Sequence, residues 1–229
     1  MCAAPNRPGR RRQVERFPTI DESPEPHLVA LVDLLGFSAA LTNASAERRS
    51  KLRGLLMYIS GLSGDFSVTP REVRAGTHPE FRGAVTGFSD TVVFSWPLDA
   101  LRTNAIPTRS ALAELQRKVC LIAGSARDAG VLVRGGITVG NLYHRNGVVI
   151  GEALIEAHEL ESRVANYPRI LVSPRVLEHA DFQLGATELM KDRDGLWCFD
   201  YIFMFFVIWT TQTLRPLRAS TRGLGPSES

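Results

Sequence analysis

The segment HLVALVDLLGF, residues 27–37, decides the fold because it is a continuous apolar run that one carboxylate, Asp33, interrupts. Pro26 precedes the run and Gly36 stands near its end. An apolar run bounded in this way is typical of a central β-strand that is buried on both faces. Because a carboxylate inside such a strand is costly to bury without a compensating positive charge, Asp33 is a candidate functional residue.

A second lone acid, Asp90, lies in the segment TGFSDTVVFS, residues 86–95, where two short runs of β-forming residues meet. This pattern predicts two strands, FRGAVTGFS and DTVVFSW, that are joined tightly at Ser89 and Asp90. The hairpin therefore carries one carboxylate at its tip, directly before an apolar strand.

The spacing of apolar residues places the other elements. Helical spacing begins after Ser38 and continues to Leu62, and a second helix is expected over residues 109–129, after the N-cap residue Thr108 and before Gly130. The remaining expected elements are a loop at 69–80, strands at 131–140 and 141–150, a helix at 151–164, and strands at 169–173 and 195–206.

The order strand, helix, two strands, helix, strand predicts an α+β fold with a ferredoxin-like βαββαβ core and additional β elements. In that sheet the strand with Asp33 lies beside the hairpin with Asp90, so both carboxylates reach one edge. Two such acids indicate a divalent cation, because Mg²⁺ and Mn²⁺ are commonly held by one or two carboxylates and substrate phosphates. The backbone N–H groups of Gly36, Phe37 and Ser38, at the start of a helix, would seat phosphate oxygens. The residues alone leave open that both aspartates are surface turn residues without a joint role.

The ends of the chain differ in composition from its middle. We expect residues 1–27 to be a disordered basic, Pro-rich tail, residues 28–209 to form one catalytic domain, and residues 210–229 to be a frayed tail. The apolar segment YIFMFFVIW, residues 201–209, has only about half of the ~20 residues that a membrane helix needs. It predicts a buried strand or an interface segment, and no membrane association.

The net charge and the cysteines indicate which partners and which cellular compartment to expect. The formal net charge is +3, and the basic excess is concentrated in the first sixteen residues, which argues against a nucleic-acid-binding surface. Cys2, Cys120 and Cys198 are an odd number without metal-like spacing, and they are expected to be free thiols. With no apolar stretch typical of a signal peptide after the basic residues, this points to the cytoplasm.

Four motifs occur in a fixed order, and together they resemble a known family. They are VALVDLLGFS, GFSDTVVFS, VRGGITVGNLY and VVIGEALIEAHELES. Over about residues 28–175 the chain resembles the class III nucleotide cyclase domain. More narrowly, it resembles the pyrimidine cyclases of the Pycsar antiphage systems, which make cyclic UMP or cyclic CMP.

The resemblance implies a role for several positions. Asp33 and Asp90 match the two acids that bind two Mn²⁺ or Mg²⁺ ions, and the backbone carbonyl of Leu34 matches a further metal contact. The turn at 36–38 matches the segment that cradles the triphosphate. One ion lowers the pKa of the ribose 3′-hydroxyl and the other steadies the triphosphate, so that the oxygen attacks the α-phosphorus and pyrophosphate leaves.

The chain departs from the family at four positions. The lysine and the acid with which purine-specific members read adenine are replaced by Thr86 and Val148. The asparagine that orients the ribose and the arginine that stabilises the transition state are replaced by Ile155 and Glu159. The first pair argues against a purine substrate. The second leaves two interpretations, a catalytically inactive nucleotide-binding module and a branch that uses other residues, and the intact metal acids favour the second.

Two further residues are candidates for nucleotide binding. Tyr58, late in the first helix, can face the base, although a half-buried core tyrosine is an equally ordinary interpretation. Arg134 is a charge in an otherwise apolar strand, and it pairs either with a phosphate or with a protein carboxylate.

Together with these residues, the resemblance implies a cytoplasmic enzyme that converts UTP to 3′,5′-cyclic UMP and pyrophosphate as a second messenger in antiphage defence. The alternatives are a cytidylate cyclase and the inactive regulatory module. The resemblance also implies a head-to-tail homodimer with its sites at the subunit interface.

Overall fold

The computed structural model describes residues 23–68, 81–99, 108–178 and 189–202. Strand β1 (Glu25–Leu35) begins within the segment expected to be an N-terminal tail. Residues 1–22 of that tail, the loop expected at 69–80 and the C-terminal tail at 210–229 lie outside the described residues.

The helices and strands follow the predicted order with additions. In chain order after β1 they are α1 (Phe37–Thr42), α2 (Ala46–Leu62), β2 (Gly64–Val68), β3 (Phe81–Phe88), β4 (Thr91–Pro97), α4 (Thr108–Asp128), β5 (Leu132–Arg145), β6 (Val148–Ile150), α5 (Glu152–Glu159), the π-helical turn η2 (Leu160–Val164), β7 (Ile170–Val172), α6 (Pro174–Glu178), β8 (Leu189–Lys191) and β9 (Trp197–Phe199).

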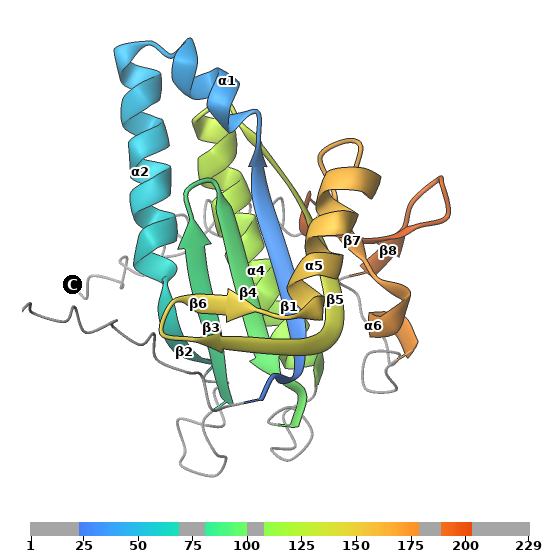
Figure 1. Ribbon diagram of the computed structural model, residues 1–229. Helices are drawn as coiled ribbons and strands as arrows, with labels where there is room; N and C mark the ends of the chain where they lie inside the picture. Colours follow the sequence, from blue (N-terminus) through green and yellow to red (C-terminus); the bar gives the residue numbers. More distant parts are fainter. Residues whose placement is uncertain (1–22, 69–80, 100–107, 179–188, 203–229) are drawn as a thin grey trace, which may run out of the picture.

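The strands form one mixed sheet with the order β2-β3-β4-β1-β5-β7-β9-β8 among the described residues, and β6 pairs with β5 (Figure 1). β1 runs antiparallel to both β4 and β5, and β3 runs antiparallel to β4. These four strands with α2 and α4 make the βαββαβ core, so the predicted α+β fold class is confirmed.

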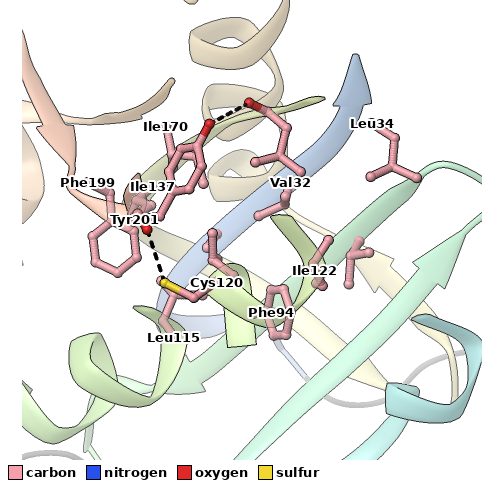
Figure 2. Packing of buried hydrophobic residues seen from close by; sticks show 14 of the residues in the cluster. Val32, Leu34, Phe94, Leu115, Cys120, Ile122, Ile137, Ile170, Phe199 and Tyr201 are labelled. Atoms are coloured by element: carbon pink, nitrogen blue, oxygen red, sulfur yellow. Dashed lines mark hydrogen bonds between the residues drawn. The ribbon is translucent and has the colours of Figure 1, made fainter. Parts of the chain in front are cut away.

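One face of the sheet packs against α2 and α4 and carries the larger core. Alternate residues of β1, among them Val32 and Leu34, point into this core beside Phe94 of β4 (Figure 2). The apolar residues predicted for the helical stripe of α4 are buried there, which confirms the spacing argument. They are Leu112, Leu115, Val119 and Ile122.

The other face of the sheet packs against α5. Val29 and Leu31, the β1 residues that alternate with the first set, are buried here with Ala157 of α5. The approach is close at Gly136 of β5, where an added Cβ would meet the carbonyl oxygen of Ala157 and would lie 2.7 Å from the Cβ of Leu160. Since Asp33 follows Leu31 by two residues, its side chain lies on this α5 face.

Some of the predicted element boundaries were wrong. The first helix is interrupted between α1 and α2, where Ser45 caps the second helix by accepting a hydrogen bond from the N–H of Arg48 at 3.2 Å. The two strands expected at 131–140 and 141–150 are a single long strand, β5, followed by a turn at Asn146 and Gly147 and the short β6. Both turn residues have positive φ, 53° and 77°, as an Asn-Gly hairpin requires.

The strand predicted at 195–206 is shorter than expected. β9 ends at Phe199, and Tyr201 lies in a helical stretch, with residues beyond 202 outside the described part. The Tyr201 hydroxyl donates to the carbonyl of Val133 at 3.2 Å, and the Cys120 thiol lies 3.2 Å from the Tyr201 carbonyl (Figure 2). Burial raises the pKa of Cys120 to about 12, so this free thiol is unreactive. No helix within the described ranges is long and apolar enough to cross a membrane.

The buried Arg169, just before β7, holds the β8–β9 hairpin. Its Nη1 donates to Asp192 at 3.0 Å and to Asp194 at 2.6 Å, and the Tyr167 hydroxyl donates to Asp192. The Tyr167 bond holds the pKa of Asp192 below its usual value of 3.8, and the Arg169 guanidinium does the same for Asp194.

This network predicts a loss of stability in acid. Carboxyl groups whose pKa is lower in the folded state stabilise the fold above their unfolded pKa, and the contribution disappears as the pH falls through the folded pKa. We expect the Asp192→Asn/Asp194→Asn variant to unfold at lower urea than the wild type at pH 7, and the difference to close towards pH 2. A difference that stays constant over this range would contradict the assignment.

Candidate active site

Asp33 and Asp90 meet where β1 ends, as the sequence predicts. β3 ends at Phe88 and β4 begins at Thr91, so Asp90 lies in the hairpin turn. The N–H of Leu34 donates to the carbonyl oxygen of Asp90 at 3.0 Å, which ties this turn to β1. Asp33 is opposite Thr91 in the ladder and accepts a hydrogen bond from the Thr91 hydroxyl at 3.1 Å.

The electrostatics of Asp33 reflect both its burial and its charged neighbours. Burial raises the pKa of Asp33, and the nearby carboxylate of Asp90 raises it further. The Thr91 hydrogen bond and the charges of Arg134 and His158 act in the opposite direction without cancelling the increase. The ionised form of Asp33 is therefore less favourable at this position than in water.

Arg134 stands on the other side of Asp33. It is opposite Asp33 in the β1–β5 ladder, and its Nε lies 3.8 Å from Oδ2 of Asp33. The same Nε makes a short ion pair with Oε1 of Glu161, in the π-helical turn η2. Of the two partners that the sequence allowed for Arg134, a phosphate and a protein carboxylate, the protein carboxylate is the one observed.

The turn after β1 has the backbone geometry expected of it. Gly36 adopts φ 83°, a left-handed conformation that favours glycine, and leads into α1. Phe37 is buried in the core, and Ser38 is exposed. The first N–H groups of a helix have no carbonyl partner within it, so this turn retains free donors directly beyond Asp33.

Tyr58 is not brought to the two aspartates. It lies on α2, half-buried against the larger core, and burial raises the pKa of its hydroxyl. The charged groups that influence it are Arg117 and Glu114 of α4. Within one chain, Tyr58 is therefore a packing residue between α2 and α4.

The four positions at which the sequence departs from the family pattern lie in different surroundings. Thr86 is buried, and its hydroxyl lies 2.8 Å from Nε2 of His144. Val148 on β6 and Ile155 on α5 are exposed. Glu159 pairs with Arg163 at 3.1 Å, one turn further along the helix.

His144 was missed by the sequence reasoning. The β5–β6 hairpin crosses the sheet (Figure 1) and brings the buried His144 onto strands β3 and β4, where Nδ1 lies 2.8 Å from the Ser95 hydroxyl. Together with Thr86 and the turn residue Asn146, His144 lines a cavity of about 420 Å³.

Glu161 was missed as well, although the sequence contains a signal for it. It lies four residues after Ala157 and eight after Ala153, and so on the buried stripe of the helix. Glu161 is 3% exposed, and His158 Nδ1 lies 3.4 Å from its Oε2. Counting these i+4 positions would have predicted a buried acid beside the sheet.

The residues present fit a divalent cation that substrate phosphates help to hold. No group of three or more His, Cys, Asp or Glu side chains within the described residues forms a metal cage. Asp33 and Asp90 provide two adjacent carboxylates whose mutual repulsion a cation would relieve. Mg²⁺ and Mn²⁺ sites of this kind use one or two carboxylates, with the substrate completing the coordination.

Of the comparisons with known proteins, the one with solved structures found similarities. No protein-family model and no curated protein matches it. Three of the solved structures that the chain resembles are those of nucleotide cyclases. The catalytic core of a rhodopsin-guanylyl cyclase with converted specificity, in complex with ATPαS, is 14% identical with a TM-score of 0.44, and the match covers 78% of this chain and 97% of that one.

The other two similarities are comparable. An adenylate/guanylate cyclase/hydrolase from Silicibacter pomeroyi is 16% identical with a TM-score of 0.40, over 76% of this chain and 96% of that one. A bacterial light-regulated adenylyl cyclase is 12% identical with a TM-score of 0.41, over 85% of this chain and 58% of that longer one. These values are too low to assign an activity, and the function is argued below from the residues of the chain itself.

Proposed function

We propose that the chain is a divalent-metal-dependent nucleotide cyclase that converts UTP to 3′,5′-cyclic UMP and pyrophosphate. The observation that carries the proposal is the meeting of Asp33 and Asp90 at the end of β1, where the Leu34 N–H binds the Asp90 carbonyl. The four motifs that resemble pyrimidine cyclases support the same function, and with it a cytoplasmic role in antiphage signalling.

Each group of the site has a defined task in this reaction. Asp33 and Asp90 hold the cations, with the Leu34 carbonyl as a further ligand. Bound cations supply Lewis-acid chemistry, which lowers the pKa of the 3′-hydroxyl and neutralises the phosphates. The N–H groups of the turn at 36–38 hold phosphate oxygens, and Arg134 adds a fixed positive charge beside Asp33.

The pyrimidine preference rests on the absence of the adenine-reading charges. Thr86 offers an uncharged hydroxyl, already bonded to His144, and Val148 offers a hydrocarbon side chain. Neither residue supplies the charged donor and acceptor pair, so adenine would bind without its usual contacts. A smaller base that is bound by neutral groups would not depend on that pair.

One observation favours the second candidate function, a catalytically inactive nucleotide-binding module. The position of the usual transition-state arginine holds Glu159, which is paired with Arg163. Loss of one charge-stabilising donor typically costs about 100-fold in rate.

A cytidylate cyclase is the nearest alternative within the enzymes, since uracil and cytosine differ at only two positions of the ring edge.

A panel of substrates tests the proposal. Purified protein is incubated with Mn²⁺ and each of UTP, CTP, ATP and GTP, and the products are separated by chromatography. The proposal predicts cyclic UMP as the main product. Cyclic CMP as the main product would assign cytosine in place of uracil. A cyclic purine product would contradict the interpretation of Thr86 and Val148. Nucleotide binding without any product would favour the inactive module.

The proposed homodimer has its own test. β6 and α5 expose three apolar side chains, Val148 (45% exposed), Ile150 (60%) and Ile155 (63%), which a partner subunit would cover. We expect the wild type to sediment as a dimer and Ile155→Glu to sediment as a monomer with little turnover. Leu41→Glu changes an equally apolar, exposed residue of α1 and serves as the control. A wild-type monomer that turns over UTP would exclude the dimer.

A further inference from the structure

The ion pair between Arg134 and Glu161 is the one strong charge interaction at the site that the proposed function leaves unexplained. Glu161 is 3% exposed, and a buried carboxylate is tolerated only with a compensating charge. Its Oε1 contacts Nε of Arg134, while Oε2 faces Nδ1 of His158 at 3.4 Å. The pair lies beside Asp33, because Nε of Arg134 is 3.8 Å from Oδ2 of Asp33. Burial raises the pKa of Glu161, and the charge of Arg134 opposes this increase.

Glu161 lies in the π-helical turn that follows α5, on the stripe that i+4 spacing from Ala157 predicts. α5 ends at Glu159, and in the next five residues the N–H of Ala165 donates to the carbonyl of Leu160 at 2.8 Å, an i to i+5 bond. The wider turn shifts the following residues relative to a regular α-helix. Such turns cost stability and are frequent at functional sites. Here the turn contains a buried acid, Glu161, beside Arg134 of β5.

Arg134 has two acids within reach and binds only one of them closely. Its Nε lies 3.8 Å from Oδ2 of Asp33, which is beyond hydrogen-bond distance, whereas its contact with Glu161 is short. An arginine released from Glu161 would turn to Asp33, because guanidinium and carboxylate form strong paired hydrogen bonds. An Asp33 bound in that way could not offer Oδ2 to a cation.

We propose that Glu161 is a positioning residue that holds Arg134 away from Asp33 and thereby keeps Asp33 available for the divalent cation. The inference rests on the proposed function, because it presupposes that Asp33 binds a metal ion. It assigns a role to the π-helical turn, and it explains how an arginine and a metal-binding aspartate can stand opposite each other in one ladder.

The test is a double-mutant cycle on Mn²⁺ binding without nucleotide, measured by water-proton relaxation enhancement. The variants are Glu161→Gln, Arg134→Met and the double variant. We expect Glu161→Gln to weaken Mn²⁺ binding about tenfold, because the released Arg134 would compete with the cation for Asp33. Arg134→Met should strengthen binding less than about threefold in the wild type and about tenfold or more in the Glu161→Gln background.

The non-additivity decides between positioning and simple charge effects. If the two side chains acted only through their separate charges, Arg134→Met would change the affinity by the same factor in both backgrounds, and the inference would be overturned. Equal affinities of the wild type and Glu161→Gln would overturn it as well. Glu159→Gln removes an exposed acid two residues earlier that pairs with Arg163, and this matched control should leave Mn²⁺ affinity unchanged.

Two further measurements separate this inference from the proposed function and from misfolding. Thermal unfolding of every variant identifies any that fails to fold, and the double variant remains informative because it contains no unpaired arginine at this position. If the wild type and Asp90→Asn bind Mn²⁺ equally poorly without nucleotide, Asp33 and Asp90 do not hold the cation by themselves, and the inference is overturned. If Asp90→Asn abolishes Mn²⁺ binding but the effects of Glu161→Gln and Arg134→Met are additive, the inference is overturned and the proposed function is not.

Discussion

Replacing Asp90 by asparagine is expected to lower the turnover of UTP by roughly 100-fold or more without destabilising the protein. The amide retains the size of the side chain but not the negative charge that a hard cation requires. Because the Asp90 carboxylate repels that of Asp33, its removal relieves an unfavourable interaction in the metal-free fold. We therefore expect an equal or higher melting temperature.

The response of the melting temperature to Mn²⁺ provides the second half of this test. A ligand that binds only the folded state raises the melting temperature, so Mn²⁺ should stabilise the wild type and leave Asp90→Asn unchanged. Asp128→Asn, at the exposed end of α4, is the matched control and should behave as the wild type in both assays. Full turnover by Asp90→Asn would show that the metal assignment is wrong.

Replacing Gly136 by alanine is expected to be strongly destabilising for so small a substitution. The new methyl group would meet the carbonyl oxygen of Ala157 and would lie 2.7 Å from the Cβ of Leu160. Backbone atoms of α5 cannot move aside as a flexible side chain can. Overpacking of this kind costs about 3 kcal/mol, which lowers the melting temperature by roughly 10 °C in a chain of this size.

The same substitution should also reduce turnover, because α5 leads directly into the π-helical turn with Glu161. The control is Gly54→Ala in α2, where nothing lies within 4 Å of an added Cβ. There alanine should stabilise the helix by about 1 kcal/mol. Scanning calorimetry of both variants checks the prediction, and a Gly136→Ala variant that melts with the wild type would contradict the close packing of α5 on β5.

The sequence sufficed to predict the position of the two acids, and the reason is local. Asp33 interrupts an apolar strand and Asp90 lies in a tight turn, so strand length and turn chemistry determine where each carboxylate lies. The order of elements then placed the two strands side by side, and the ladder between Asp33 and Thr91 agrees with it.

Residues whose role depends on tertiary packing could not be found in this way. His144 reaches Thr86 and Ser95 only because β5 is long enough to carry its hairpin across the sheet, and the predicted division of this segment hid that length. Tyr58 lies half-buried where α2 packs on α4, near Arg117 and Glu114, and its contact with a base stays a prediction.

The measurement that tests the account most directly counts both products of one reaction. The protein is incubated with UTP and Mn²⁺, and cyclic UMP and pyrophosphate are quantified from the same sample, with Asp90→Asn in parallel. The account predicts the two products in equal amounts from the wild type and neither from the variant. Uridine monophosphate in place of cyclic UMP, equal turnover by the variant, or no product from the wild type would contradict it.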